Sequence, residues 1–69
     1  MRYTKFVVKV SRVGALGVEY VQRIDRKPIQ TTPVPRLALL MGKMIATEVL
    51  ESLEKTRWTP EIVAVQVNG

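Results

Sequence analysis

The first part of the chain alternates between apolar and polar side chains. Over residues 3–13, Phe6, Val8 and Val10 would fall on one side of an extended backbone. The other side would carry Lys5, Val7, Lys9 and Ser11. A period of two with many β-branched residues is typical of a half-buried strand.

The alternation resumes after a short segment with a glycine at each end, Gly14 and Gly17. Glycine readily takes the positive φ angles that hairpin turns require. Downstream, Val18, Tyr20 and Ile24 alternate with Glu19, Val21, Arg23 and Asp25. We therefore predict a hairpin over residues 3–26, with one dry face carrying Tyr20 and one largely wet face.

The pattern then breaks and becomes helical. Pro28 cannot donate to a sheet ladder, so residues 27–35 are predicted to be a connector. From residue 36 to residue 57, Ile45, Val49 and Leu53 recur at helical spacing, with Glu51 and Glu54 on the opposite side. The sequence predicts a helix over 36–57.

A third strand is expected over residues 61–67, where Ile62, Val63 and Val65 follow Pro60. The order ββαβ predicts an α+β fold: a three-stranded antiparallel sheet, in the order 2-1-3, with the helix packed on one face. We expect one domain spanning residues 1–69, because a chain of 69 residues has room for no more.

Composition narrows the chemistry. The chain has no cysteine and no histidine, which excludes disulfides and the ordinary zinc sites and leaves neither residue to act as a catalytic base or nucleophile, while Ser11 and Ser52 have no evident activating partner. The glycine spacing fits neither the dinucleotide nor the phosphate-loop motif. No enzyme activity, cofactor or metal is therefore expected. Without a signal peptide or a long apolar run, we expect a cytoplasmic protein that does not enter membranes.

Charge is unevenly distributed. The net charge is +5, with +6 in residues 1–36 and −1 in residues 37–69. Such asymmetry favours an acidic protein surface or a nucleic acid as partner. The candidate binding residues are Lys5, Lys9, Arg12, Arg23, Arg26, Lys27 and Arg36.

The predicted helix is apolar on both sides in its first half. Leu37, Leu40 and Met44, with Met41 nearby, would project away from the sheet. One interpretation is a contact surface for a second copy or another protein. The alternative is that the connector folds back and covers these side chains. Trp58 is a candidate either for the interface or for the core.

These features predict a non-enzymatic protein-interaction module that forms a homodimer and acts as an inhibitor or adaptor by occluding a partner. The partner would present an acidic surface. A short chain without motifs also fits the style of phage or mobile-element inhibitors of a host machine. The alternative is a small basic nucleic-acid-binding domain that uses the hairpin face.

Overall fold

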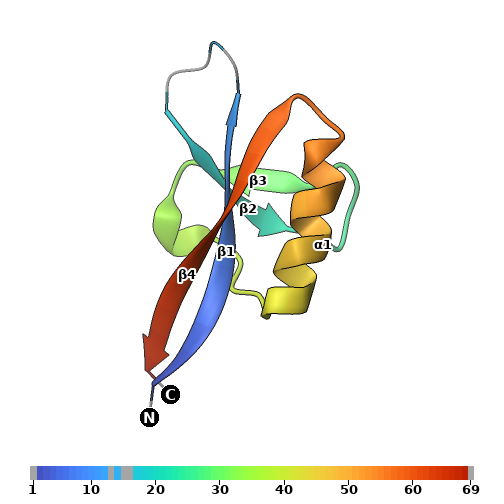
Figure 1. Ribbon diagram of the computed structural model, residues 1–69. Helices are drawn as coiled ribbons and strands as arrows, with labels where there is room; N and C mark the ends of the chain where they lie inside the picture. The colour runs from blue at the N-terminus through green and yellow to red at the C-terminus, as the bar shows by residue number, and fades with distance from the viewer. Residues whose placement is uncertain (1, 13, 15–16, 69) are drawn as a thin grey trace.

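Two long antiparallel strands run along the length of the molecule. The computed structural model describes residues 2–12, 14 and 17–68. Strand β1 (Arg2–Arg12) pairs along its whole length with β4 (Trp58–Asn68), from Arg2 opposite Asn68 to Arg12 opposite Trp58. The pair makes the molecule elongated, with extents of 40 × 22 × 18 Å, and brings the start of β1 beside the end of β4 (Figure 1).

The predicted hairpin is present, but its two strands soon separate. Strand β2 (Glu19–Arg23) pairs with β1 only at Lys9 opposite Tyr20 and Val10 opposite Glu19. Gly14 and Gly17 have φ angles of 83° and 90°, which confirms the expected use of glycine in the turn. Val13, Ala15 and Leu16 lie outside the described residues.

The sheet has four strands, so the prediction of three strands was wrong. The extra strand, β3 (Gln30–Thr32), lies inside the predicted connector and pairs with β2, giving the order β3-β2-β1-β4. The expected neighbours of β1, namely the second and the last strand, are confirmed. The short β3 escaped prediction because three residues between Pro28 and Pro33 carry little periodic signal.

One face of the sheet forms the core with helix α1 (Lys43–Glu54). Val8, Val10 and Val21 meet Ala46, Val49 and Leu53 of the helix, and all are buried. The prediction that Val18, Tyr20 and Ile24 form the dry face of the second strand was wrong. Val18 and Ile24 are exposed, whereas Val21 is buried. Strand β2 has a single large nonpolar or aromatic side chain in each register, Val21 in one and Tyr20 in the other, and pairing of Val10 with Glu19 turns Val21 toward the core.

The helix begins at Lys43, not at residue 36, and ends at Glu54. Residues Pro35–Leu37 form a 3-10 turn, η1, and Ala38 is extended with a ψ of 138°. Gly42 is also extended, and its carbonyl accepts the amide of Ala46 as the first helical bond. The helical spacing before residue 43 was therefore misleading.

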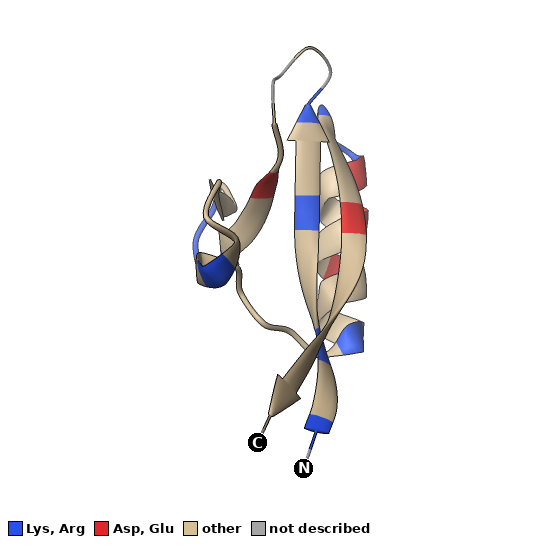
Figure 2. Ribbon diagram, turned by 90° about the vertical axis from the view of Figure 1, so that its left-hand side faces the viewer, with Lys and Arg blue, Asp and Glu red and all other residues tan. Residues whose placement is uncertain are grey.

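Residues 39–41 leave the helix pattern because the sheet binds their backbone. The amide of Leu39 donates to the carbonyl of Val21 at 2.9 Å, and Met41 exchanges two 2.8 Å bonds with Phe6. These bonds fill the space where β1 and β2 diverge. The chain thus crosses from the η1 side of the sheet to the helix side, and η1 and α1 lie on opposite sides of the β1–β4 pair (Figure 2).

Candidate protein-interaction surface

The face of the sheet turned away from α1 carries the odd-numbered side chains of the two long strands. We call it the open face; it includes Val7 of β1 and Val63 and Val65 of β4. The β1–β4 register places Val7 opposite Val63 and Lys5 opposite Val65. Because directly opposed residues point to the same side of a sheet, these side chains form one continuous strip.

A groove runs between this strip and the segment that precedes the helix. Its walls are Val7, Val63, Val65 and Tyr20 from the sheet, and Pro35, Arg36, Ala38 and Leu40 from the segment. The groove measures about 470 Å³, within the range of sites that hold a ligand or a peptide side chain. We call it the open-face groove. Its lining is apolar except for Arg36 and the hydroxyl of Tyr20.

The segment over residues 35–40 holds its position through local bonds and the crossover. The buried Thr32 hydroxyl accepts the amide of Val34 at 3.2 Å, which turns the chain after β3. The amide of Leu37 donates to Val34 and that of Ala38 to Pro35, which closes the 3-10 turn. Because the next residues are bonded into the sheet, the groove wall is fixed at both ends.

Cations flank the groove on the open face. Lys9 forms an ion pair with Glu61 at 3.4 Å, and the ammonium of Lys5 lies 5.9 Å from the ring centroid of Tyr3. Arg36 stands on the wall itself and is exposed. An apolar floor with positive charge around it suits a partner that is apolar at its centre and acidic at its edges.

The four apolar side chains predicted for a helical contact surface do not lie on one helix. Leu37 and Leu40 precede α1 and are 49% and 48% exposed, while Met44 lies in the first turn of α1 and is 77% exposed. Met41 is only 4% exposed and belongs to the core. Of the four, Leu40 alone lines the open-face groove. The connector leaves Leu37, Leu40 and Met44 uncovered.

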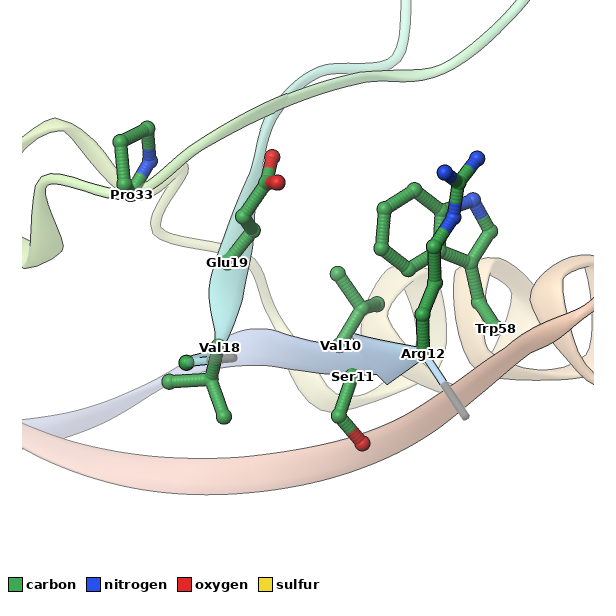
Figure 3. Close-up of a pocket in the computed structure, with 8 residues that line it drawn as sticks. Val10, Ser11, Arg12, Val18, Glu19, Pro33 and Trp58 are labelled. Carbon is green, nitrogen blue, oxygen red and sulfur yellow. The ribbon is translucent and has the colours of Figure 1, made fainter. Parts of the chain in front are cut away.

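Trp58 is half-buried and packs against the core cluster. The guanidinium of Arg12 lies over its ring at 4.4 Å, a cation–π contact. Beside this stack is a small pocket of about 190 Å³ between the ends of β1, β2 and β4. The stacked Arg12 and Trp58 stand at one side of it and Glu19 and Pro33 at the other (Figure 3).

That pocket is smaller than a typical ligand site. Its carboxylate is already engaged, because the Thr31 hydroxyl donates to Glu19. The other polar groups that line it are the Arg12 guanidinium, the Ser11 hydroxyl and the indole N–H of Trp58. It therefore supports a local packing role for Trp58 more strongly than a binding role.

The other predicted basic residues are dispersed. Arg23 forms a 2.8 Å ion pair with Asp25, and this hydrogen-bonded contact holds the pKa of Asp25 below its ordinary value. The exposed Arg26 and Lys27 follow in the loop before β3. The structure thus brings Lys5, Lys9 and Arg36 to the open face and leaves the rest of the predicted set elsewhere.

Sequence reasoning missed most of the groove. Tyr20, Val63, Val65, Pro35 and Ala38 line it, yet none was predicted as a contact residue. A signal was present in the last strand, which is apolar at both odd and even positions from 62 to 65. A strand that is apolar in both registers is typical of a sheet that packs against something on each face.

Three further findings bear on the site. No group of three or more potential metal-ligating side chains occurs among the described residues. Within the same part of the chain, no helix is long and apolar enough to cross a membrane. Comparisons with protein-family models, curated proteins and solved structures gave no match. The case for function therefore rests on the surface itself.

Proposed function

We propose that this protein is a non-enzymatic protein-interaction module that holds an extended segment of a partner in the open-face groove. The observation that carries the proposal is an apolar groove of about 470 Å³ with Arg36 on its wall. Grooves of this kind, with a few polar groups to fix orientation, are the usual sites of peptide recognition. By occupying such a segment the protein would act as an inhibitor or adaptor.

The preferred partner segment has apolar side chains at alternate positions and acidic side chains between or beside them. Its apolar side chains would cover Val63, Val65 and Leu40. Its carboxylates would meet Arg36 and Lys5, the two cations nearest the groove that have no carboxylate partner among the described residues. Charge complementarity of this type accelerates association and selects among partners.

Small size supports the proposal as well. A chain of 69 residues buries a modest core, and such domains often gain stability from a partner. Binding to the folded state alone would raise the free energy of unfolding by mass action.

The test compares two leucines of nearly equal exposure. Leu40→Glu places a charge in the groove, whereas Leu37→Glu makes the same change in charge and exposure outside its lining. The probe is a short synthetic peptide that alternates leucine and glutamate, titrated by calorimetry and by NMR. We expect Leu40→Glu to weaken binding at least about tenfold, roughly 1.4 kcal/mol, and Leu37→Glu to change it little.

Two outcomes would count against this assignment. Equal losses in the two variants would mean that negative charge, and not the groove, weakens the peptide. Shift changes that avoid Val63 and Val65 would place the peptide on another surface. Urea unfolding of both variants serves as the control that each remains folded.

The alternative function is nucleic-acid binding by the open face. It is supported by Lys5 and Lys9 on that face, next to the exposed ring of Tyr3. A fluorescent single-stranded oligonucleotide would then bind with an affinity that falls steeply with salt, and Lys5→Glu combined with Lys9→Glu would abolish binding. Binding that is weak at low salt and insensitive to the double substitution would exclude this alternative.

A further inference from the structure

The outer edge of β4 is a second surface, separate from the open-face groove. Strand β4 ends the sheet order, and in the described part of the chain no strand pairs with its outer side (Figure 1). The strand has 11 residues, about twice the ordinary length. A long strand edge presents a row of backbone donors and acceptors that another strand can pair with.

The backbone bonds of β1 establish which groups face outward. Phe6 exchanges both its amide and its carbonyl with Met41, on the side of β1 away from β4. Backbone groups alternate between the two sides of a strand, so odd-numbered residues of β1 bond toward β4. They pair with odd-numbered residues of β4 in the observed register. The even-numbered residues of β4, including Ile62, Ala64 and Gln66, therefore direct their amides and carbonyls outward.

Pro60 independently agrees with this assignment. It is also even-numbered, and within a sheet proline is confined to positions where its missing amide faces away from a neighbouring strand. Its carbonyl still points outward as an acceptor. The usable edge thus runs from the carbonyl of Pro60 to the amide of Asn68.

Beyond Pro60 at its start, this edge lacks the usual protection against strand pairing. Natural edges are commonly short or carry lysine, whereas residues 59–68 contain no lysine or arginine and only one charge, Glu61. Ala64 lies at the middle of the edge, exposed and small enough to allow a second backbone to approach. Most of the positive charge lies in residues 1–36, so two copies that meet along β4 bring few like charges together.

We propose that two copies of this chain pair antiparallel along β4, with the two-fold axis at Ala64, to form one continuous sheet. Residues whose backbone amide and carbonyl point outward are then paired across the interface. Ala64 lies opposite Ala64 of the second copy, and Ile62 lies opposite Gln66. Each such pair exchanges two backbone hydrogen bonds. Glu61 faces the uncharged Val67, so no like charges are opposed in this register.

The same symmetry joins the two open faces. Val63 of one copy lies opposite Val65 of the other, on the side that carries the grooves. The two apolar strips become continuous across the axis. We therefore infer that a second copy of the chain pairs with this edge. Its own β4 matches the edge in length, in charge and in the placement of apolar residues.

The test uses charge at the axis. Ala64→Lys and Ala64→Glu each oppose two like charges, so each should weaken the dimer about tenfold. Mixing the two variants should restore a heterodimer, because lysine then faces glutamate. Thr59→Lys is the matched control: it adds the same charge to an exposed position of β4, outside the paired segment. Sedimentation equilibrium measures the mass of wild type and variants up to about 1 mM protein, a concentration that detects even weak dimers.

Hydrogen exchange on the wild type gives a second readout that needs no variant. Protection of the Ile62, Ala64 and Gln66 amides should rise with protein concentration, while the inward amides of Val63 and Val65 stay protected throughout. The proposal is overturned if the wild type is a monomer at every concentration, if the mixture of charge variants stays monomeric, or if exchange at the even positions ignores concentration. None of these readouts depends on the groove binding a peptide, so the two proposals can fail separately.

Discussion

The two faces of the sheet are built from the same strands yet end in different environments. On the helix side, Val8 and Val10 are fully buried beneath α1. On the open side, Val63 and Val65 are β-branched residues at matching positions, but they remain half-exposed. The difference lies in the cover and in the strand, because Val7 of the inner strand β1 is only 6% exposed on the open face, whereas Val63 and Val65 belong to the edge strand β4. A helix of 12 residues closes one face, while the segment around the three-residue turn η1 walls in only part of the other.

This contrast teaches that a strand's sequence does not decide alone how deeply its side chains are buried. In β4 both faces carry apolar residues, with Ile62 and Ala64 on one side and Val63 and Val65 on the other. The face with an incomplete cover keeps unused capacity to bury apolar area, at about 25 cal/mol per Å². We regard that capacity as the physical basis of the proposed partner site.

The largest expected effect is on the free energy of unfolding, and it distinguishes the helix that covers one face from the segment that walls the open-face groove. Leu53→Ala removes a buried side chain from the helix cover and should lower the free energy of unfolding by about 3 kcal/mol. Leu40→Ala removes the same atoms from the half-exposed groove wall and should lower it by less than about 1 kcal/mol. Urea unfolding followed by circular dichroism measures both. Similar losses in the two variants would mean that the faces are equally packed in solution.

A smaller difference in the free energy of unfolding is expected between valines on the two strands. Val10→Ala deletes two fully buried methyl groups and should lower the free energy of unfolding by about 2 kcal/mol, while Val65→Ala should cost less than about 1 kcal/mol. In the presence of a saturating groove ligand, the cost of Val65→Ala should increase, because the ligand buries that side chain. If the ligand does not change the cost of Val65→Ala, the ligand does not bind in the open-face groove.

The sequence predicted the parts of the fold that have strong local signals. The alternation of Phe6, Val8 and Val10 placed β1 and the face that meets the helix correctly, although Val7 on the opposite face is also buried. The last strand and its position beside β1 were also predicted. A helix was predicted in the right region because Val49 and Leu53 recur at helical spacing. These features depend on periodicity within one segment.

The errors arose where long-range bonds override local preference. Leu39 and Met41 fit a helical pattern, but hydrogen bonds to Val21 and Phe6 hold them extended. Met41 consequently left the predicted contact surface for the core. The groove could not be predicted from any single segment, because its walls come from β1, β2, β4 and the residues before α1. The only signal for the groove within one segment was the run of apolar residues from 62 to 65 in the last strand.

The pairing of β1 with β4 also constrains the order of folding. Arg2 bonds opposite Asn68, so the longest strand pair joins segments separated by almost the whole chain. Contacts between such distant segments form slowly, since the intervening chain must lose its freedom before the contacts can stabilise it. During synthesis β1 emerges before β4, so it has no partner on that side until β4 has been made. We therefore expect β1, one of the two inner strands of this sheet, to be fully paired only late, once β4 has been made on the growing chain.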